Sequence, residues 1–262
     1  MTKTLVALGY RKAVLVGLMM ASSGVALAQA GTELHVAAAA DLQPVLPTLA
    51  AKYAAETGVK IVASFGSSAT LMQQIENGAP QDVFLSADFV HPQELVAGGL
   101  TVESSPVPYA RGVLVLWARK DSPAQPLTLD VLTSAKVTKI AIANPLHAPY
   151  GLAATEALKS LHLTDATKDK LVVAENIGQT AQFAESGNAQ VGLISLTIAS
   201  SPHYKELGSF LRFPVSSYPV IRQSGVVLKS SKNQAAAKAF LDWLTSAAVQ
   251  ADLPSFGLDA AN

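Results

Sequence analysis

Four short segments place small and hydroxyl residues where an apolar run gives way to a helical pattern. They span residues 35–42, 64–68, 144–151 and 175–180. The N-terminus of a helix presents unpaired N–H groups and the positive end of the helix dipole, so it suits a small anion. Small residues are also common at such turns for structural reasons alone. The four turns taken together therefore favour anion binding, and none of them does so alone.

A hydrolase is the main alternative class. Ser, His and Asp are all present, but no Gly-x-Ser-x-Gly motif occurs, and neither Ser67 nor Ser68 has a glycine two residues later. The five histidines show no pairing at the spacing of metal ligands, and only His147 falls near the predicted cleft. We therefore expect no enzymatic activity, no cofactor and no bound metal cation.

The first thirty residues have the pattern of a secretory signal peptide. They hold three basic residues and no acidic one, an apolar run over 13–21, and two Ala-x-Ala sites that predict cleavage after Ala28 or Ala30. A membrane anchor is less consistent with the pattern, because the apolar run is shorter than the ~20 residues that span a bilayer. We expect an exported chain that begins near residue 31.

Charge and cysteine content limit the possible partners and location of the protein. The whole chain has 19 basic and 19 acidic residues, and cleavage leaves 16 basic against 19 acidic, a net charge of −3. With no basic run after residue 30, nucleic acid and anionic membranes are not expected partners. The absence of cysteine excludes disulfides and a lipid-modified N-terminal cysteine. We expect a soluble periplasmic protein that is not a lipoprotein.

Alternating apolar runs and helical patterns predict an α/β fold with mostly parallel sheets. The paired segments are 34–38 with 42–56, 61–65 with 68–77, 83–85 with 91–97, and 140–143 with 151–161. Two longer apolar segments, 110–118 and 219–228, each contain an internal glycine and are interpreted as crossings between two lobes. The predicted lobes are residues 31–112 plus 222–262 and residues 113–221.

Five segments resemble, in order and over nearly the whole mature chain, the periplasmic molybdate-binding proteins of ABC importers. They are 38–42, 66–71, 74–88, 148–151 and 175–180, and the most specific block is Gly-Ala-Pro at 78–80 followed by Phe-Leu-Ser-Ala-Asp at 84–88. The resemblance implies a two-lobed type II periplasmic binding protein fold, with two sheets flanked by helices and joined by two crossing strands. It also implies a monomer that closes on molybdate or tungstate and delivers it to an inner-membrane ABC permease.

The resemblance also implies site residues. Ser68 matches the hydroxyl ligand of the first lobe, Tyr150 a contact from the second lobe, and Ile177 an apolar residue that offers its backbone N–H. Asp41 stands where the family has Ser or Asn, and Ser195 stands where some members have a ligand Tyr. Uncharged donors suit a dianion, since each charge-assisted hydrogen bond contributes about 1.5–3 kcal/mol.

Asp41 is the residue whose role is open. A carboxylate within ~4 Å of a dianion costs several kcal/mol at an effective dielectric constant near 20. We therefore expect its side chain to point away from the ligand and to cap the following helix, with Pro44 in the first turn, while its backbone N–H or that of its neighbour faces the anion. The alternative is that Asp41 accepts a proton from a monoprotonated oxyanion.

Two further alternatives remain open within the binding class. The ligand could be sulfate, phosphate or a small organic acid, since the four turns indicate an anion without naming it. The chain could also be a sensor domain whose closed form docks on a membrane receptor instead of a permease. A screen of purified protein against a panel of oxyanions would distinguish the ligands.

Overall fold

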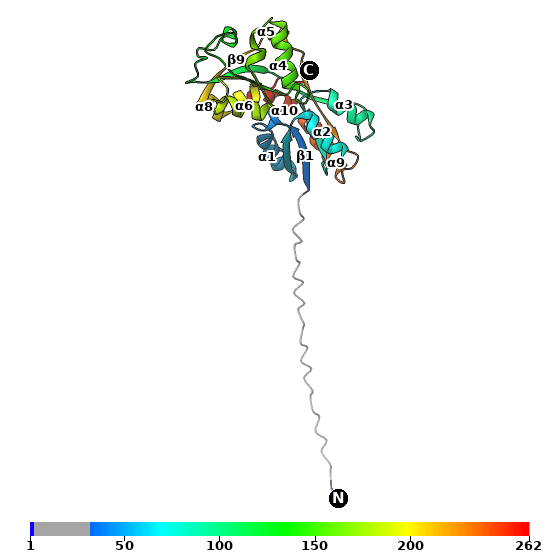
Figure 1. Ribbon diagram of the computed structural model, residues 1–262. Helices are drawn as coiled ribbons and strands as arrows, with labels where there is room; N and C mark the ends of the chain where they lie inside the picture. Colours follow the sequence, from blue (N-terminus) through cyan, green and yellow to red (C-terminus); the bar gives the residue numbers. More distant parts are fainter. Residues whose placement is uncertain (3–31, 262) are drawn as a thin grey trace. The chain divides into compact units, whose positions relative to one another are not determined.

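The computed structural model describes residues 1–2 and 32–261, so the predicted signal peptide lies almost wholly outside the described residues. Residues 32–261 belong to one compact unit, which contains two five-stranded sheets (Figure 1). Within the described residues, no helix combines the length and the apolar character needed to cross a membrane.

The first sheet has the strand order β2-β1-β3-β10-β4. Its strands are β1 (Glu33–Ala39), β2 (Lys60–Gly66), β3 (Val83–Ser86), β4 (Val107–Gly112) and β10 (Ile221–Val227). β1 pairs in parallel with β2 and β3, whereas β10 is antiparallel to β3 and β4. The accompanying helices are α1 (Leu46–Thr57), α2 (Ser68–Glu76), α3 (Val90–Ala97), α9 (Gln234–Leu244) and α10 (Ala247–Asp252). Figure 1 shows the C-terminal α9 and α10, in orange to red, returning to the blue and cyan N-terminal elements.

The second sheet has the strand order β7-β6-β8-β5-β9. Its strands are β5 (Leu114–Arg119), β6 (Ile140–Ala143), β7 (Leu171–Ala174), β8 (Val191–Ser195) and β9 (Gly208–Arg212). The helices of this half are α4 (Pro149–Ser160), α5 (Thr164–Thr167), α6 (Ile177–Glu185), α7 (Leu196–Ala199) and α8 (Pro202–Leu207). Five 3-10 turns complete the described elements: η1 (Ala40–Leu42), η2 (Leu129–Leu132), η3 (Lys168–Lys170), η4 (Val215–Ser217) and η5 (Leu253–Phe256).

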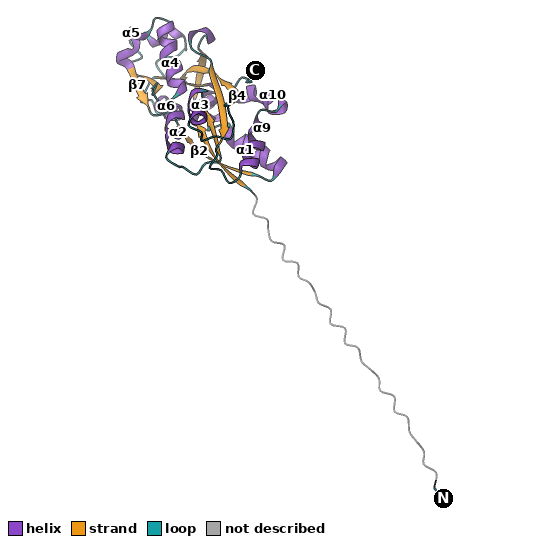
Figure 2. Cartoon of the chain, turned by 90° about the vertical axis from the view of Figure 1, so that its right-hand side faces the viewer, coloured by secondary structure: helices purple, strands orange, loops and turns teal. Residues whose placement is uncertain are grey.

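The chain passes between the two sheets twice. β4 ends at Gly112 in the first sheet and β5 begins at Leu114 in the second, so only Val113 separates them, where the sequence predicted one continuous strand. The return runs through residues 213–220, between β9 and β10. In Figure 2 helices flank the strands of both sheets. The predicted two-lobed α/β fold is confirmed, and each sheet with its helices is called a lobe below.

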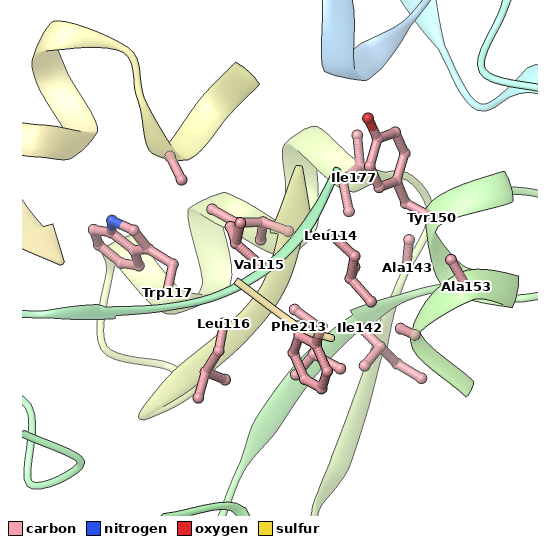
Figure 3. Close-up of a cluster of buried hydrophobic side chains, with 14 of the residues drawn as sticks. Leu114, Val115, Leu116, Trp117, Ile142, Ala143, Tyr150, Ala153, Ile177 and Phe213 are labelled. Carbon is pink, nitrogen blue, oxygen red and sulfur yellow. The ribbon is translucent and has the colours of Figure 1, made fainter. Parts of the chain in front are cut away.

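Each lobe has its own apolar core. The first lobe packs α1 and α9 against the sheet through Leu46, Tyr53 and Phe240, all buried. In the second lobe, β5 contributes Leu114 to Ala118 to the core, with Trp117 fully buried (Figure 3). Such burial of large side chains contributes about 1.5–3 kcal/mol per residue, and it gives the turns at the strand ends a rigid base.

Gly151 allows α4 to lie directly against β6. A Cβ at this position would collide with the carbonyl oxygen of Ala143 and would lie 2.8 Å from the carbonyl carbon of Asn144. The close approach fixes the first turn of α4, which carries Tyr150, against the end of the strand. Gly151 therefore helps to position Tyr150 in the site described next.

Candidate functional site

The carboxyl ends of parallel strands and the helices that follow them surround a small cavity between the lobes. Its lining residues are Ala39, Ala40, Asp41, Gly66, Ser67, Ser68, Ala87, Ala148, Pro149, Tyr150, Asn176 and Ile177. Its volume is about 10 Å³, room for roughly one water molecule. The four residues predicted from the sequence, Asp41, Ser68, Tyr150 and Ile177, all lie on it. No Lys, Arg or His occurs among these described lining residues.

Three helices begin at the cavity. α2 begins at Ser68, α4 at Pro149 and α6 at Ile177. The caps explain two of these starts, because the side chain of Ser67 accepts from the N–H of Thr70 at 3.3 Å and that of Asn176 accepts from the N–H of Gln179 at 3.0 Å. The first N–H groups of each helix have no partner within the helix and carry the positive end of its dipole. The cavity is therefore surrounded by donors that bear no net charge.

Ser68 is buried, with 1% of its surface exposed. Its Oγ accepts from the N–H of Ala87 at 3.2 Å, which joins the start of α2 to the end of β3. Since that bond uses a lone pair of the oxygen, the hydroxyl proton stays available for donation to another group. Ser68 thus offers a fixed O–H donor at the cavity wall.

Tyr150 stands at the boundary between the apolar core of the second lobe and the cavity. Figure 3 shows its ring and Ile177 at the edge of the core, with the phenol oxygen pointing away from the aliphatic side chains. Gly112 makes room for this oxygen, because a Cβ there would collide with the hydroxyl and lie 2.9 Å from Cζ. Burial raises the pKa of Tyr150 well above its usual value of 10, and the nearby Asp41 adds to the effect. The phenol is therefore a neutral donor.

The expected capping role of Asp41 is wrong. α1 begins at Leu46 with Val45 as its N-cap and Pro47 in its first turn, and no side chain caps it. Asp41 lies inside the 3-10 turn η1, which is itself preceded by Ala39 as cap, so its carboxylate is not positioned before a helix. Tertiary contacts outweigh the local preference of Asp for helix caps. The Asp41 side chain is wholly buried and accepts two hydrogen bonds from residues distant in the sequence.

The carboxylate of Asp41 is bonded at one oxygen only. Oδ2 accepts from the hydroxyl of Tyr150 at 3.3 Å and from Nε2 of Gln223 at 2.5 Å. Oδ1 and the Oε1 of Gln223 are, among the described residues, the two buried side-chain polar atoms without a hydrogen-bond partner. Burial raises the pKa of Asp41 from 3.8 to about 7, although the bonds from Gln223 and Tyr150 act in the opposite direction.

Gln223 was not among the residues singled out from the sequence. It lies on β10 and is fully buried. Its Nε2 also donates to the hydroxyl oxygen of Tyr150 at 3.3 Å. A buried amide needs partners, so a glutamine within the apolar run 219–228 was the available signal. Its partner Asp41 lies 182 residues away in the chain, and no local pattern could identify that pairing.

In addition to the bonds that Tyr150 makes with Asp41 and Gln223, three hydrogen bonds join the lobes near the cavity. The N–H of Ala69 donates to the carbonyl of His147 at 3.1 Å, and Oγ1 of Thr70 donates to Oε1 of Glu175 at 3.2 Å. Oγ1 of Thr197 donates to the carbonyl of Asp41 at 2.7 Å. The described conformation is therefore a closed one, held by bonds from both lobes.

Two residues considered in the sequence do not line the cavity. Ser195 caps α7 and its hydroxyl lies 2.7 Å from that of Thr197, which in turn donates to the carbonyl of Asp41. His147 is half-exposed, with Nδ1 3.6 Å from Oε1 of Glu175. Within residues 32–261 no cluster of three or more His, Asp or Glu side chains is arranged to hold a metal ion.

Comparison with known proteins gives a consistent picture. A family described as bacterial extracellular solute-binding protein matches residues 34–259. The molybdate-binding protein ModA of Azotobacter vinelandii is 39% identical over 223 residues, which cover 84% of this chain and 86% of that protein. ModA of Rhodobacter capsulatus is 37% identical over 221 residues, with coverage of 84% and 86%.

A solved structure agrees with these sequence matches. The periplasmic molybdate-binding protein of Azotobacter vinelandii superposes with a TM-score of 0.78 at 35% identity, covering 86% of this chain and 98% of that one. Coverage of this extent means that the similarity extends over both lobes.

Proposed function

We propose a transport function for this chain, which belongs to the family of bacterial extracellular solute-binding proteins. The ligand proposed is molybdate, with tungstate as its close substitute, captured between the lobes and passed to an ABC permease in the inner membrane. The relatives that carry the name molybdate-binding protein support this ligand. Asp41, Ser68, Tyr150 and Ile177 are the proposed ligand-binding residues.

The observation that carries the proposal is the convergence of three helix N-termini and two buried hydroxyls on one small cavity. Such a site supplies N–H and O–H donors without a cationic side chain, and charge-assisted bonds of this kind contribute about 1.5–3 kcal/mol each. Fixed donors at the walls of a tight cavity discriminate by the size of the anion. Molybdate and sulfate carry the same charge and shape, so size is the property left to separate them.

The proposal extends to the processing and location of the protein. The lobes are assigned to residues 31–112 plus 222–262 and to residues 113–221, after removal of residues 1–30 as a signal peptide. The mature protein is proposed to be a monomer in the periplasm, neither lipid-anchored nor enzymatic. The absence of cysteine supports the lack of a lipid anchor, and the absence of a Gly-x-Ser-x-Gly motif supports the lack of hydrolase activity.

A thermal-shift panel of oxyanions tests the ligand. Molybdate or tungstate at 100 times its dissociation constant adds about 2.7 kcal/mol to the free energy of unfolding, which raises the Tm by roughly 5–10 °C for a domain of this size. Sulfate and phosphate at the same concentrations should shift it by less than a degree or two. Equal shifts for sulfate and molybdate would show that the molybdate assignment is wrong.

A further inference from the structure

The proposed ligand and an ionised Asp41 are incompatible by charge alone. Asp41 lines the cavity, and among the described residues no cationic side chain pairs with it. An ionised carboxylate there would repel a dianion strongly, because Asp41 is wholly buried and the effective dielectric constant around it is low. A neutral carboxyl group in the same place would be a hydrogen-bond donor.

The hydrogen bonds decide which oxygen can hold a proton. Oδ2 accepts from Tyr150 and Gln223, so its lone pairs are engaged. Oδ1 is buried, has no partner among the described residues, and belongs to a side chain on the cavity wall. A proton on Oδ1 leaves both existing bonds intact and satisfies this atom as soon as an acceptor enters the cavity.

We propose that Asp41 binds the anion as a neutral carboxylic acid: as the dianion enters, Oδ1 takes up one proton from solvent and donates the resulting O–H bond to an oxygen of the ligand. This inference rests on the proposed function. It makes Asp41 a specificity-determining donor, and it makes binding proton-linked. No covalent bond to the ligand forms or breaks, and the proton returns to solvent on release.

The groups that face Asp41 reinforce this behaviour. Tyr150 on α4 and Tyr109 on β4 are the titratable groups that interact with it, and burial keeps both phenols neutral. β10 contributes the amide of Gln223 and α7 the hydroxyl of Thr197, which donates to the backbone carbonyl of Asp41. Burial already raises the pKa of Asp41 to about 7 before any anion is present, and an entering negative charge raises it further.

Calorimetric titration with sodium molybdate tests the inference. With a free-state pKa of about 7, the wild-type protein should take up about one proton per ion at pH 8, and its dissociation constant should rise about tenfold from pH 6 to pH 8. Proton uptake is measured directly by repeating the titration in two buffers that differ in their heats of ionisation.

Two variants complete the test. Asp41→Asn carries a permanent N–H donor in place of the acid, so its proton uptake should vanish and its affinity should vary by less than about twofold between pH 6 and pH 8. At pH 8 it should bind molybdate more tightly than the wild type does. His147→Gln removes a titratable side chain that directly precedes the lining residue Ala148, and this variant should keep the full pH dependence of the wild type.

The outcomes separate the inference from the function on which it rests. A wild-type protein that binds molybdate tightly without proton uptake overturns the inference alone, as does a pH dependence that persists in Asp41→Asn. Phosphate binding that disappears in Asp41→Asn, together with weak molybdate binding at every pH, would mean that the carboxylate accepts a proton from the ligand instead. If no protein binds molybdate at any pH, the proposed function itself is wrong.

Discussion

The hydroxyl of Tyr150 donates to Oδ2 of Asp41 at 3.3 Å, a bond between residues 109 positions apart in the chain. It joins the start of α4 in the second lobe to η1 in the first, at the wall of the cavity. The donor of one lobe thus fixes the acidic group of the other. Predictions about this site therefore concern both lobes at once.

The first prediction concerns the hydroxyl of Ser68. Ser68→Ala removes the O–H donor at the start of α2 and should weaken molybdate binding by about 1.5–3 kcal/mol, the range for a hydrogen bond to a charged group. Isothermal titration calorimetry measures the loss, and far-UV circular dichroism should show an unchanged fold. Ile177→Val is the matched control, because only the backbone N–H is assigned a role there. An unchanged affinity in Ser68→Ala would remove this residue from the site.

The second prediction concerns the space around Tyr150. Tyr150→Phe deletes the donor, and Gly112→Ala displaces it, because a Cβ at 112 would collide with the phenol oxygen. Each change should weaken molybdate binding by about 1–3 kcal/mol. Both act on one hydroxyl, so the double variant should lose much less than the sum of the two single losses. Additive losses in the titrations would show that Gly112 acts independently of Tyr150.

The sequence predicts the parts of this molecule that depend on local rules. The caps Ser67 and Asn176 belong to residue types that favour helix starts, and they place Ser68 and Ile177 at the cavity. Local rules fail at Asp41, because burial and the bonds from Tyr150 and Gln223 outweigh its preference for a cap. They also fail at Val113, where a single apolar run is divided between strands of two different sheets. They fail again at Gln223, whose hydrogen-bond partner Asp41 is distant in the sequence.

The third prediction concerns closure of the lobes. In the closed conformation the cavity of about 10 Å³ has room for roughly one water molecule, so we expect the lobes to separate when a tetrahedral anion enters. We expect hinge motion near Arg111–Gly112 and Arg222–Gly225, where strands β4 and β10 lie beside the crossings. Small-angle X-ray scattering should give a smaller radius of gyration with saturating molybdate than without it. An identical radius in both samples would argue against closure.

The fourth prediction concerns the bond between Thr70 and Glu175. Its atoms lie 3.2 Å apart and join the two lobes beside the lining residue Asn176, and the Glu175 side chain is about half exposed. Glu175→Ala should leave the free energy of unfolding within about 0.5 kcal/mol of the wild type, as expected for a surface change. It should increase the dissociation rate of molybdate, because the lost bond joins the two lobes. Stopped-flow dilution measures that rate, and an unchanged rate would mean that the contact has no part in holding the lobes together.

The last prediction concerns the cost of Asp41 to the ligand-free protein. Its pKa is about 7 in the folded chain and near 3.8 when unfolded, so between these values the folded state binds more protons than the unfolded state. The free energy of unfolding should therefore fall as the pH rises from about 4 to 7 and then level off. A shift of about 3 pKa units corresponds to a contribution on the order of 4 kcal/mol. Urea unfolding of the wild type and of Asp41→Asn at pH 5 and pH 8 measures it, because Asn cannot titrate. The wild type should lose more stability than the variant between these two pH values. Parallel losses in both proteins would show that Asp41 is already ionised, without penalty, in the folded state.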